Sequence, residues 1–541
     1  MPTPRATSFS RSAPLLAAID IGSNAVRFAL ARLGPRGSLQ VLEERRRPTR
    51  LGANLASGGP LPKAGVKAAI AAAKEFCFDA LRHKVARIRV VATAAVREAP
   101  DGPQFVERLR REIGLPVEII GPDEEARLAF ASCRAAFSLE NETVAVVDIG
   151  GGSAQVALAW RGVLYESISL PLGAVRLTET FRSPGRPITP PQLEKLRKHA
   201  ARVIKEHLER PPLRPVSLIG CGGTFATIGA LAGDFSARRP LAPMIARPSR
   251  TLRSAGHAVA DLREVCDEVC GLTLEKRADL LKKAQVPPDR ADILPAGLLV
   301  AMELCKRLRV ERIVPHAGGV RDGILREMGS AQEPGPLVQL TRTFAQRALY
   351  ERRHSEHVAH LAVALLHELA ELPALRDGLA DCPRASELLE SAGLVHDLGV
   401  PIDYPRHHKV SRRIVELAHW PGVRADERAL IANIARYHRK SLPAMDHAHF
   451  AALPRRSRQH AQILAGILRI ADGLDRPHDQ AVHGLHAKAT RAGLVLFAEG
   501  APAGGPALRA AQKKADLLQK VLRRPVILRP EPDRIRVTGS K

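Results

Sequence analysis

Two hydrophobic hairpin patterns occur in the first part of the chain, over residues 15–33 and 143–160. Each consists of an apolar run, a polar tip and a second apolar run, which predicts a strand, a tight turn and another strand. The tips are Gly22-Ser23-Asn24 and Gly150-Gly151-Gly152-Ser153, and both complete an Asp-Ile-Gly core. Because the same plan returns about 128 positions later, we expect an internal duplication.

Strand and helix patterns alternate between and after these hairpins. Apolar residues at helical spacing predict helices, and short β-branched runs predict strands. The expected helices cover residues 64–81, 105–113 and 192–208, and the expected strands cover residues 88–92, 117–120, 216–219 and 313–314. Such alternation is typical of an α/β fold.

The pattern changes after about residue 329, where helical periodicity replaces the strand runs and histidines become frequent. Pro334-Gly335-Pro336 interrupts the chain at this point. Beyond His483, strand-like runs at 494–497, 525–528 and 535–537 flank a helical pattern over 507–522. We therefore expect two α/β domains, an all-α domain and a small α+β end-piece, with limits at 14–127, 128–329, 337–483 and 484–541.

The charge balance narrows the classes of partner. The formal net charge is +26, and such an excess favours partners that carry many negative charges, either a polyanionic substrate or nucleic acid. Aromatic residues make up only 4% of the chain, which leaves few stacking platforms for single-stranded nucleic acid. We expect a polyanionic substrate and no specific nucleic-acid partner.

Cysteine usage and hydropathy indicate the compartment. The seven cysteines are scattered and form no CxxC pair, which argues against a zinc ribbon or a disulfide framework and favours a reducing compartment. The longest apolar run, near residues 295–305, is far shorter than the ~20 residues needed to cross a bilayer. We expect a cytoplasmic chain without a transmembrane segment.

The two glycine-rich tips carry the first candidate chemistry. Backbone N–H groups in such a turn can approach phosphate oxygens closely, and hydroxyl or amide side chains add further donors. Asp20 and Asp148 stand at the strand ends, where a carboxylate can hold Mg²⁺ or a water beside that phosphate. One such turn is also common in ordinary hairpins. The duplicate, with a third turn at Gly222-Gly223-Thr224, favours a phosphate site.

A pair of glutamates and an arginine can complete the reaction. Asp123, Glu124 and Glu125 begin a predicted helix, where acidic residues also serve as caps. One glutamate remains to deprotonate a water that attacks a phosphoanhydride. Arg97 follows a predicted strand and can stabilise charge on a transferring phosphoryl group, although a solvated arginine on a helix face has the same pattern.

The motifs Ala18 to Asn24, Thr93 to Arg97, Asp123 to Arg127 and Val147 to Ser153, in this order and spacing, resemble the exopolyphosphatase / guanosine pentaphosphate phosphatase family. The resemblance implies two actin-like, RNase H-like domains around a phosphate cleft, with Mg²⁺, K⁺ and a homodimer. It implies that Glu125 is the catalytic base, that Asp148 assists it and binds Mg²⁺ with Glu125, and that Arg97 clamps phosphate. It implies phosphate binding by Asp20, Gly22, Ser23, Asn24, Gly150, Gly151, Gly152, Ser153, Gly223 and Thr224.

The helical half carries a second pattern. His354, His396-Asp397 and Asp472 resemble the H…HD…D pattern of HD-type metallophosphohydrolases. This resemblance implies a divalent metal held by those four residues. His407 or His408, together with His438, can supply ligands for a second metal. Relatives often carry a degenerate HD-like domain, so the pattern leaves open whether this half binds metal or is active.

These observations predict an exopolyphosphatase that releases terminal orthophosphate from inorganic polyphosphate. Hydrolysis of guanosine pentaphosphate (pppGpp) is the close alternative. No guanosine pocket can be recognised in the sequence, so the sequence does not decide between the two substrates. From other classes, an actin-like kinase, a catalytically silent polyanion-binding regulator, and an enzyme whose working centre is the HD-type half are also consistent with the motifs.

Overall fold

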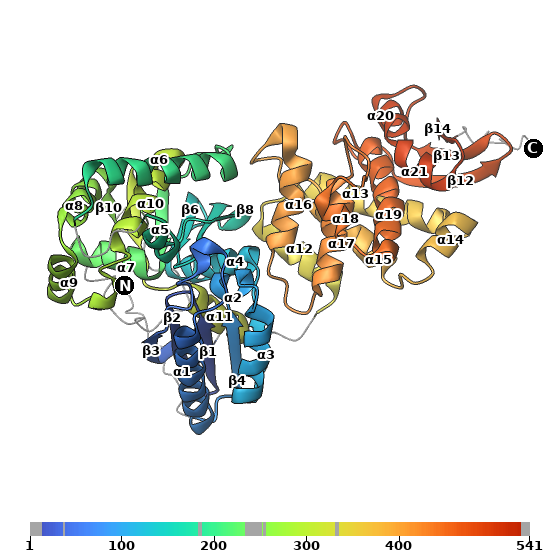
Figure 1. The fold of residues 1–541 in the computed structure, drawn as a ribbon. Coiled ribbons are helices and arrows are strands. Elements are labelled where there is room, and N and C mark those ends of the chain that lie inside the picture. The colour runs from blue at the N-terminus through green and yellow to red at the C-terminus, as the bar shows by residue number, and fades with distance from the viewer. Residues whose placement is uncertain are drawn as a thin grey trace, which may run out of the picture. The chain divides into compact units, whose positions relative to one another are not determined.

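The computed structural model describes residues 13–35, 38–181, 187–232, 252, 256–330 and 335–531. The chain divides into two compact units, Met1–Ala331 and Gln332–Lys541 (Figure 1). The first unit contains two mixed β-sheets with helices, and the second is mainly helical with one small sheet.

The first sheet has the strand order β3-β2-β1-β4-β5. Its strands are β1 (Leu15–Ile21), β2 (Ala25–Leu33), β3 (Leu39–Pro48), β4 (Arg87–Ala92) and β5 (Val117–Ile119). Helices α1 (Lys63–Arg82), α2 (Ala94–Glu98) and α3 (Gly102–Ile113) pack with the core formed by one face, and α4 (Pro122–Ala136) and α11 (Val320–Gly329) with the core of the other. Alternate residues of β1 enter these two cores, so the strand is buried on both faces.

The second sheet has the strand order β10-β11-β9-β6-β7-β8. Its strands are β6 (Thr143–Ile149), β7 (Ala154–Trp160), β8 (Val163–Leu170), β9 (Ser217–Cys221), β10 (His257–Ala258) and β11 (Arg312–Pro315). The helices that accompany it are α5 (Ala174–Phe181), α6 (Pro190–His207), α7 (Gly222–Leu231), α8 (Val259–Gly271), α9 (Leu274–Lys283) and α10 (Leu294–Leu308).

The two sheets repeat one plan. In each, an antiparallel hairpin is followed by a third antiparallel strand, and a parallel strand lies on the other side of the first strand. Each tip is closed by an equivalent hydrogen bond. In the first tip Gly22 N donates to Ala25 O (3.1 Å), and in the second Gly150 N donates to Ser153 O (3.0 Å). The internal duplication is therefore visible in the fold. The boundary expected between residues 127 and 128 falls inside α4, a helix that contacts β6, β7 and β8 of the second sheet and packs against α11.

The helices of the second unit are α12 (Leu337–Arg347), α13 (Arg352–Glu368), α14 (Pro373–Leu379), α15 (Ala385–Val395), α16 (His407–Leu417), α17 (Ala425–Arg436), α18 (Ala448–Ala451) and α19 (Arg455–Leu474). A three-stranded sheet follows, made of β12 (Gly484–Thr490), β13 (Gly493–Glu499) and β14 (Val526–Pro530). The single helix expected over 507–522 is two helices, α20 (Pro506–Lys514) and α21 (Asp516–Leu522). The strand expected at 535–537 lies outside the described residues.

Glycines let the end-piece pack closely on the helical bundle. Gly473 of α19 lies against Ala511 of α20, where an added Cβ would come within 2.6 Å of the Ala511 Cα. Gly466, two turns earlier on α19, faces Leu518 of α21 in the same way. Helix α20 is thereby held against α19, with its last residue, Lys514, beside the bundle.

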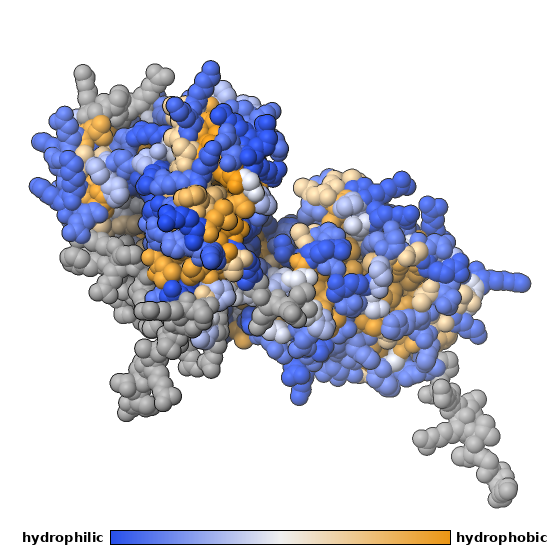
Figure 2. Space-filling model, turned by 90° about the horizontal axis from the view of Figure 1, so that it is seen from below, coloured by the Kyte–Doolittle hydropathy of each residue, from blue (hydrophilic) through white to orange (hydrophobic). Residues whose placement is uncertain are grey.

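The face shown in Figure 2 carries hydrophilic residues over most of its described surface, with hydrophobic residues gathered in smaller areas. Within the described part of the chain, no single helix is both long and apolar enough to span a membrane. One bent pair, α13 with α14, meets that criterion by length and composition, with a bend of 108° between the two helices.

Candidate active site

A small cavity of about 70 Å³ lies in the first unit, between the two hairpin tips. Its lining residues belong to the two tips and the adjoining ends of β1, β2 and β6, the turn from β4 to α2, the first turn of α4, the turn after β9, and the start of α11 with the loop before it. They are Asp20, Gly22, Ser23, Asn24, Ala25, Arg27, Thr93, Ala94, Glu125, Asp148, Gly150, Gly151, Gly152, Ser153, Gly222, Ala317, Gly318, Gly319, Val320 and Arg321. The structure thus brings most of the predicted site residues together.

The two tips contact each other directly. A Cβ added to Gly151 would come within 2.9 Å of the Ser23 Cβ, and one added to Gly152 would come within 3.0 Å of the Ser23 Oγ. Any larger residue at either position would separate the loops. The glycines therefore allow two groups of backbone donors to face one small volume, as a phosphate site requires.

In the third predicted turn, Gly222-Gly223-Thr224, the residue that lines the cavity is not one of those predicted to bind phosphate. Gly222 lines the cavity, whereas the predicted phosphate ligands Gly223 and Thr224 do not. The space beside the Gly223 Cα is filled by the Arg290 guanidinium, and Thr224 is buried and donates its hydroxyl to the Ile149 carbonyl (3.3 Å). These two residues pack and brace the turn, and Gly222 is the member that reaches the site.

Glu125 points toward the cavity from the first turn of α4. Its Oε2 lies 3.3 Å from Arg97 NH1 and 3.5 Å from Gln155 Nε2. Arg97 also donates to the Ile120 carbonyl (2.8 Å) and does not itself line the cavity. Burial raises the pKa of Glu125 to about 8, with smaller contributions from Asp148 and Asp20, and the Arg97 guanidinium opposes that rise. Glu125 is therefore poised to exchange a proton near neutral pH.

The neighbouring Glu124 has a different environment. Its Oε1 accepts from Arg89 NH2 (2.7 Å) and lies 3.5 Å from Arg127 NH2. Adjacent residues of a helix point about 100° apart, because a turn takes 3.6 residues. The structure therefore separates the two glutamates, with one in an ion-pair network and one at the cavity.

Asp20 and Asp148 occupy equivalent positions at the ends of β1 and β6. Burial raises the pKa of both carboxyl groups, while the nearby Arg27 lowers it. The Asp20 Oδ1 is buried without a hydrogen-bond partner. Clustered buried carboxylates of this kind fit a divalent cation, and Mg²⁺ commonly uses one or two of them together with substrate phosphate oxygens.

Four polar residues near the cavity were not predicted from the sequence. Arg27 pairs in register with Asp20, and Gln155 pairs in register with Asp148. Arg321 lines the cavity and donates to the Phe28 carbonyl (3.0 Å). Arg290 is buried behind Gly223, and burial lowers its pKa to about 9. The duplication itself could have identified the first two, since each lies seven positions after the aspartate of its repeat.

The chain is similar in sequence to known phosphatases. A model of the Ppx/GppA phosphatase family matches residues 32–331, and a model of Ppx/GppA phosphatase domain III matches residues 340–494. The chain belongs to the Ppx/GppA phosphatase family. An exopolyphosphatase 2 of Mycobacterium tuberculosis is 31% identical over 327 residues, which cover 57% of this chain and 97% of that protein.

Two further relatives extend the comparison. A guanosine-5'-triphosphate,3'-diphosphate pyrophosphatase of Vibrio vulnificus is 25% identical over 439 residues, covering 81% of this chain and 83% of that protein. An exopolyphosphatase of Cytophaga hutchinsonii has a solved structure with a TM-score of 0.50 and 21% identity, covering 58% of this chain and 97% of that one. At this identity the likeness shows the fold, which is the actin-like Ppx/GppA fold.

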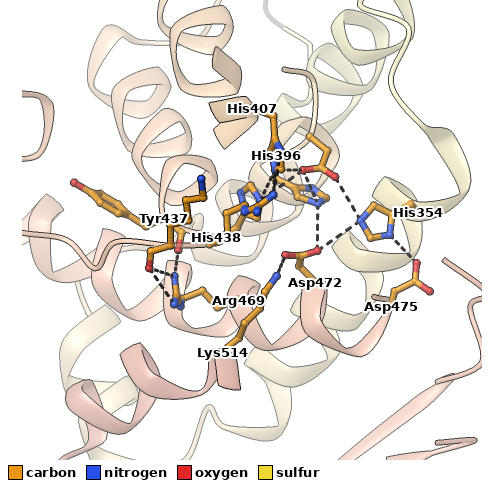
Figure 3. A network of polar contacts seen from close by, with 12 residues as sticks. His354, His396, His407, Tyr437, His438, Arg469, Asp472, Asp475 and Lys514 are labelled. Atoms are coloured by element: carbon orange, nitrogen blue, oxygen red, sulfur yellow. Dashed lines mark hydrogen bonds and ion pairs between the residues drawn. The ribbon is translucent and has the colours of Figure 1, made fainter. Parts of the chain in front are cut away.

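The C-terminal unit of this Ppx/GppA family member places the second predicted residue set in two adjoining groups. His354, His396 and Asp397 form one group, and Asp397, His407 and His438 form the other, with ligand atoms within 4.8 Å of one another in each. Asp472 lies beside the first group, 3.7 Å from His354 Nε2 (Figure 3). His408 belongs to neither group, because the next residue of a helix points elsewhere and His407 takes the position.

Proposed function

We propose that this Ppx/GppA family member is a phosphoanhydride hydrolase that releases terminal orthophosphate from inorganic polyphosphate. The observation that carries the proposal is Glu125, a carboxyl group with its pKa raised to about 8 that lines a cavity between two glycine-rich tips. A carboxylate of this kind matches the pKa that a general base needs near neutral pH. The phosphatase family and the names of its relatives agree with this chemistry.

In the proposed reaction, Glu125 accepts a proton from water as the water oxygen attacks the terminal phosphorus. The bond from that phosphorus to the bridging oxygen breaks, and the shortened polyphosphate leaves with the electron pair. Backbone N–H groups of the two tips, with Ser23 and Ser153, hold the terminal phosphate. Asp20, Asp148 and Glu125 would hold Mg²⁺, which supplies neutralisation of the developing charge.

The residues around Glu125 act on its position and charge. Arg97 binds the Glu125 carboxylate and the Ile120 carbonyl together. Gln155 donates toward Glu125, Ser153 and Ser169, at 3.5, 3.0 and 3.1 Å. We infer that Arg97 and Gln155 are positioning residues that aim the carboxylate at the attacking water.

Glu125→Gln tests the proposal, because the amide keeps the shape and removes the base. We expect release of orthophosphate from long-chain polyphosphate to fall by about 10²–10⁴-fold, while filter binding of polyphosphate is retained. Glu124→Gln is the matched control, since it changes the adjacent glutamate that is ion-paired away from the cavity, and it should leave the rate within a few-fold. Equal losses in both variants, or none in either, would contradict the assignment.

Guanosine pentaphosphate is the second candidate substrate. The Vibrio vulnificus relative is named for a guanosine pentaphosphate activity and matches more of this chain than the exopolyphosphatase does. Side-by-side measurement of orthophosphate release from polyphosphate and from this nucleotide, as kcat/KM, decides between them. If kcat/KM is higher for the nucleotide than for polyphosphate, the nucleotide replaces polyphosphate as the proposed substrate and the proposed site stays the same.

We also propose a reducing, cytoplasmic setting and a homodimer. All seven cysteines are free and buried, which fits a compartment where thiols stay reduced. Light scattering of the purified chain would test the dimer, and a mass of one chain at micromolar concentration would contradict it.

A further inference from the structure

The start of α5 binds three successive backbone carbonyls of the second hairpin tip. The backbone hydrogen bonds run from Ala174 N to Gly150 O (2.9 Å), and from Val175 N and Arg176 N to Gly151 O (3.0 and 3.1 Å). The next carbonyl, Gly152 O, accepts from the Arg176 side chain, whose Nε lies 2.8 Å away. The carbonyl side of this tip is therefore bound to α5.

This contact orients the donors of the tip. A peptide carbonyl and the N–H of the following residue point in opposite directions, because the peptide unit is planar and trans. The N–H groups of Gly151, Gly152 and Ser153 are thus turned away from α5, and these three residues line the cavity. Gly173 permits the close approach, since a Cβ there would come within 2.2 Å of Gly151 O.

The first tip is held in the same manner by the segment that follows β3. Ser23 O accepts from Gly52 N (2.7 Å). Asn24 O accepts from Thr49 N and Arg50 N (3.0 and 3.1 Å). Each tip is therefore held through its carbonyls by the chain that follows the antiparallel strands of its own sheet.

The Arg176 side chain joins the second tip to the side of the first sheet. Its NH1 donates to Leu55 O (3.4 Å), and its NH2 pairs with the Glu98 carboxylate. Leu55 follows β3, and Glu98 ends α2, the helix after β4. One guanidinium therefore binds a carbonyl of the second tip and two groups that follow strands of the first sheet.

Helix α2 connects this arginine to the proposed base. Glu98 is adjacent to Arg97, whose NH1 lies 3.3 Å from the Glu125 carboxylate. A continuous set of contacts thus runs from Gly152 through Arg176 and the end of α2 to Glu125. Arginine suits this position because its planar fork carries five N–H donors, so it can bind three acceptors at once.

We propose that Arg176 is a positioning residue that fixes the second phosphate-binding tip relative to Glu125. The proposal rests on the hydrolase function proposed above and adds a residue outside the lining of the cavity. In-line attack requires the water at Glu125 and the phosphorus at the tips to be aligned, and a misplacement of about 1 Å can cost about 10²-fold in rate. Alignment matters most in the transition state, so its loss lowers kcat more than it raises KM.

Arg176→Gln tests the proposal, because the amide lacks the charge and the fork. We expect kcat for orthophosphate release from long-chain polyphosphate to fall by about 10–10²-fold, with KM changed by only a few-fold. Arg202→Gln is the control, since Arg202 is an exposed arginine that pairs with Glu206 on its own helix, α6, and it should match the parent. A raised KM at unchanged kcat in Arg176→Gln would indicate a substrate-binding residue and would overturn the positioning role.

A double-mutant cycle tests the path through α2. Glu98→Gln removes the carboxylate that Arg176 binds there, and it should lower kcat by less than Arg176→Gln does. If both residues act through one contact, the double variant should be no slower than Arg176→Gln alone. Losses that multiply in the double variant would overturn the path from the tip to α2.

Thermal unfolding separates positioning from misfolding. The ion pair of Arg176 is partly exposed, with 18% and 39% of its two side chains accessible, so the Tm of Arg176→Gln should stay within about 4 °C of the parent. A loss of rate that only follows a loss of folded chain would overturn the proposal.

Glu125→Gln, measured in the same assay, separates this proposal from the function on which it rests. A large loss in Glu125→Gln with a full rate in Arg176→Gln overturns the positioning role and leaves the hydrolase function in place. Equal rates for the parent and Glu125→Gln overturn the hydrolase function itself.

Discussion

Neighbouring glutamates on α4 receive opposite environments from the side chains around them. Glu124 forms ion pairs with Arg89 and Arg127. Glu125 lies among Asp20, Asp148 and Arg97 in a buried place, where its charge is disfavoured. Two residues of one type, one position apart, therefore differ in chemistry because of what surrounds them.

The pKa of Glu125 sets the expected pH profile. A base works only when deprotonated, and the pKa of Glu125 is raised to about 8. Below that value the deprotonated fraction falls about tenfold per pH unit, so kcat/KM for polyphosphate should rise from pH 6 and level off above about pH 8. Initial rates at constant ionic strength and Mg²⁺ would measure this limb.

Arg97 supplies a check on the same prediction. Its guanidinium lowers the pKa of Glu125, so Arg97→Gln should move the rising limb to higher pH as well as slowing the reaction. A limb that stays in place in Arg97→Gln would show that another group controls it.

Gly222 allows a second test at the residue scale. Its φ is 76°, and a Cβ there would overlap the Asp148 Oδ1. Gly222→Ala should cost about 1–3 kcal/mol of unfolding free energy through strain and should reduce phosphate release at least tenfold by displacing Asp148. Urea unfolding and orthophosphate assays would measure the two effects.

Gly114→Ala separates backbone strain from the clash at Gly222. Gly114 has a similar φ of 68°, with open space where its Cβ would stand. This variant should lose about 1 kcal/mol of stability and keep full activity. Loss of activity at Gly114, or full activity at Gly222, would contradict the role given to the turn.

Helices α4 and α11 show how packing fixes the site at the scale of elements. A Cβ on Gly323 of α11 would overlap the backbone of Leu128 in α4, so these helices cross at very close range. Alanine normally stabilises a helix by about 1 kcal/mol relative to glycine. Gly323→Ala should instead destabilise the chain by about 1–3 kcal/mol, because either helix must move.

The control for that substitution is Gly271→Ala at the end of α8. This glycine has nothing within 4 Å of its Cβ position, so its replacement should be neutral or stabilising. Chemical unfolding curves would show whether the unfolding free energy of each variant is lower or higher than that of the parent. A stabilised Gly323→Ala would mean that the two helices are not tightly packed.

The sequence predicted the elements whose apolar period matches their burial. The hairpin tips, β4, α1 and α3 were found in this way, and the duplication implied by the repeated tips is present in both sheets. Strand β3 was missed, because its second half, Glu43 to Pro48, is mostly charged and lies at the sheet edge. Strand β8 was also missed, since its alternation is irregular and a register shift occurs in its pairing with β7.

Site prediction failed where function depends on pairing across the fold. Arg27 lines the cavity and Gln155 approaches Glu125 only because their strands pair with β1 and β6. Arg321 comes from a helix far along the chain. No local motif marks these residues, whereas glycine turns and an acidic helix start are local and were recognised. The sequence did not decide between His407 and His408 as a metal ligand, because it does not show which side of the helix faces His438.

At the scale of the whole molecule, the basic side chains behind the net charge of +26 do not all contribute equally to binding a polyanion. Part of it is neutralised locally, since Arg45 pairs with Glu43, Glu75 and Asp79, and Arg47 pairs with Glu75. Arg27 and Arg321 line the cavity, although Arg321 also pairs with Glu44 (3.0 Å). Charge next to the site, more than the total, therefore governs how a polyanion is held.

Salt should reveal this contribution. A long polyphosphate carries a charge on every unit, so its binding should weaken with ionic strength more than that of tripolyphosphate. Between about 50 and 200 mM KCl we expect the KM for long chains to rise roughly tenfold more than the KM for tripolyphosphate. Steady-state assays of both substrates would measure it, and parallel salt dependences would contradict extended contact.

The close crossing of α4 and α11 has a mechanical consequence. The chain leaves the first sheet through α4, which contacts β6, β7 and β8 of the second sheet, and returns to the first sheet through α11. The pair of helices therefore couples the two sheets. Gly318 and Gly319 lie just before α11 and line the cavity, so we expect an anion bound by their backbone to fix the orientation of one sheet relative to the other.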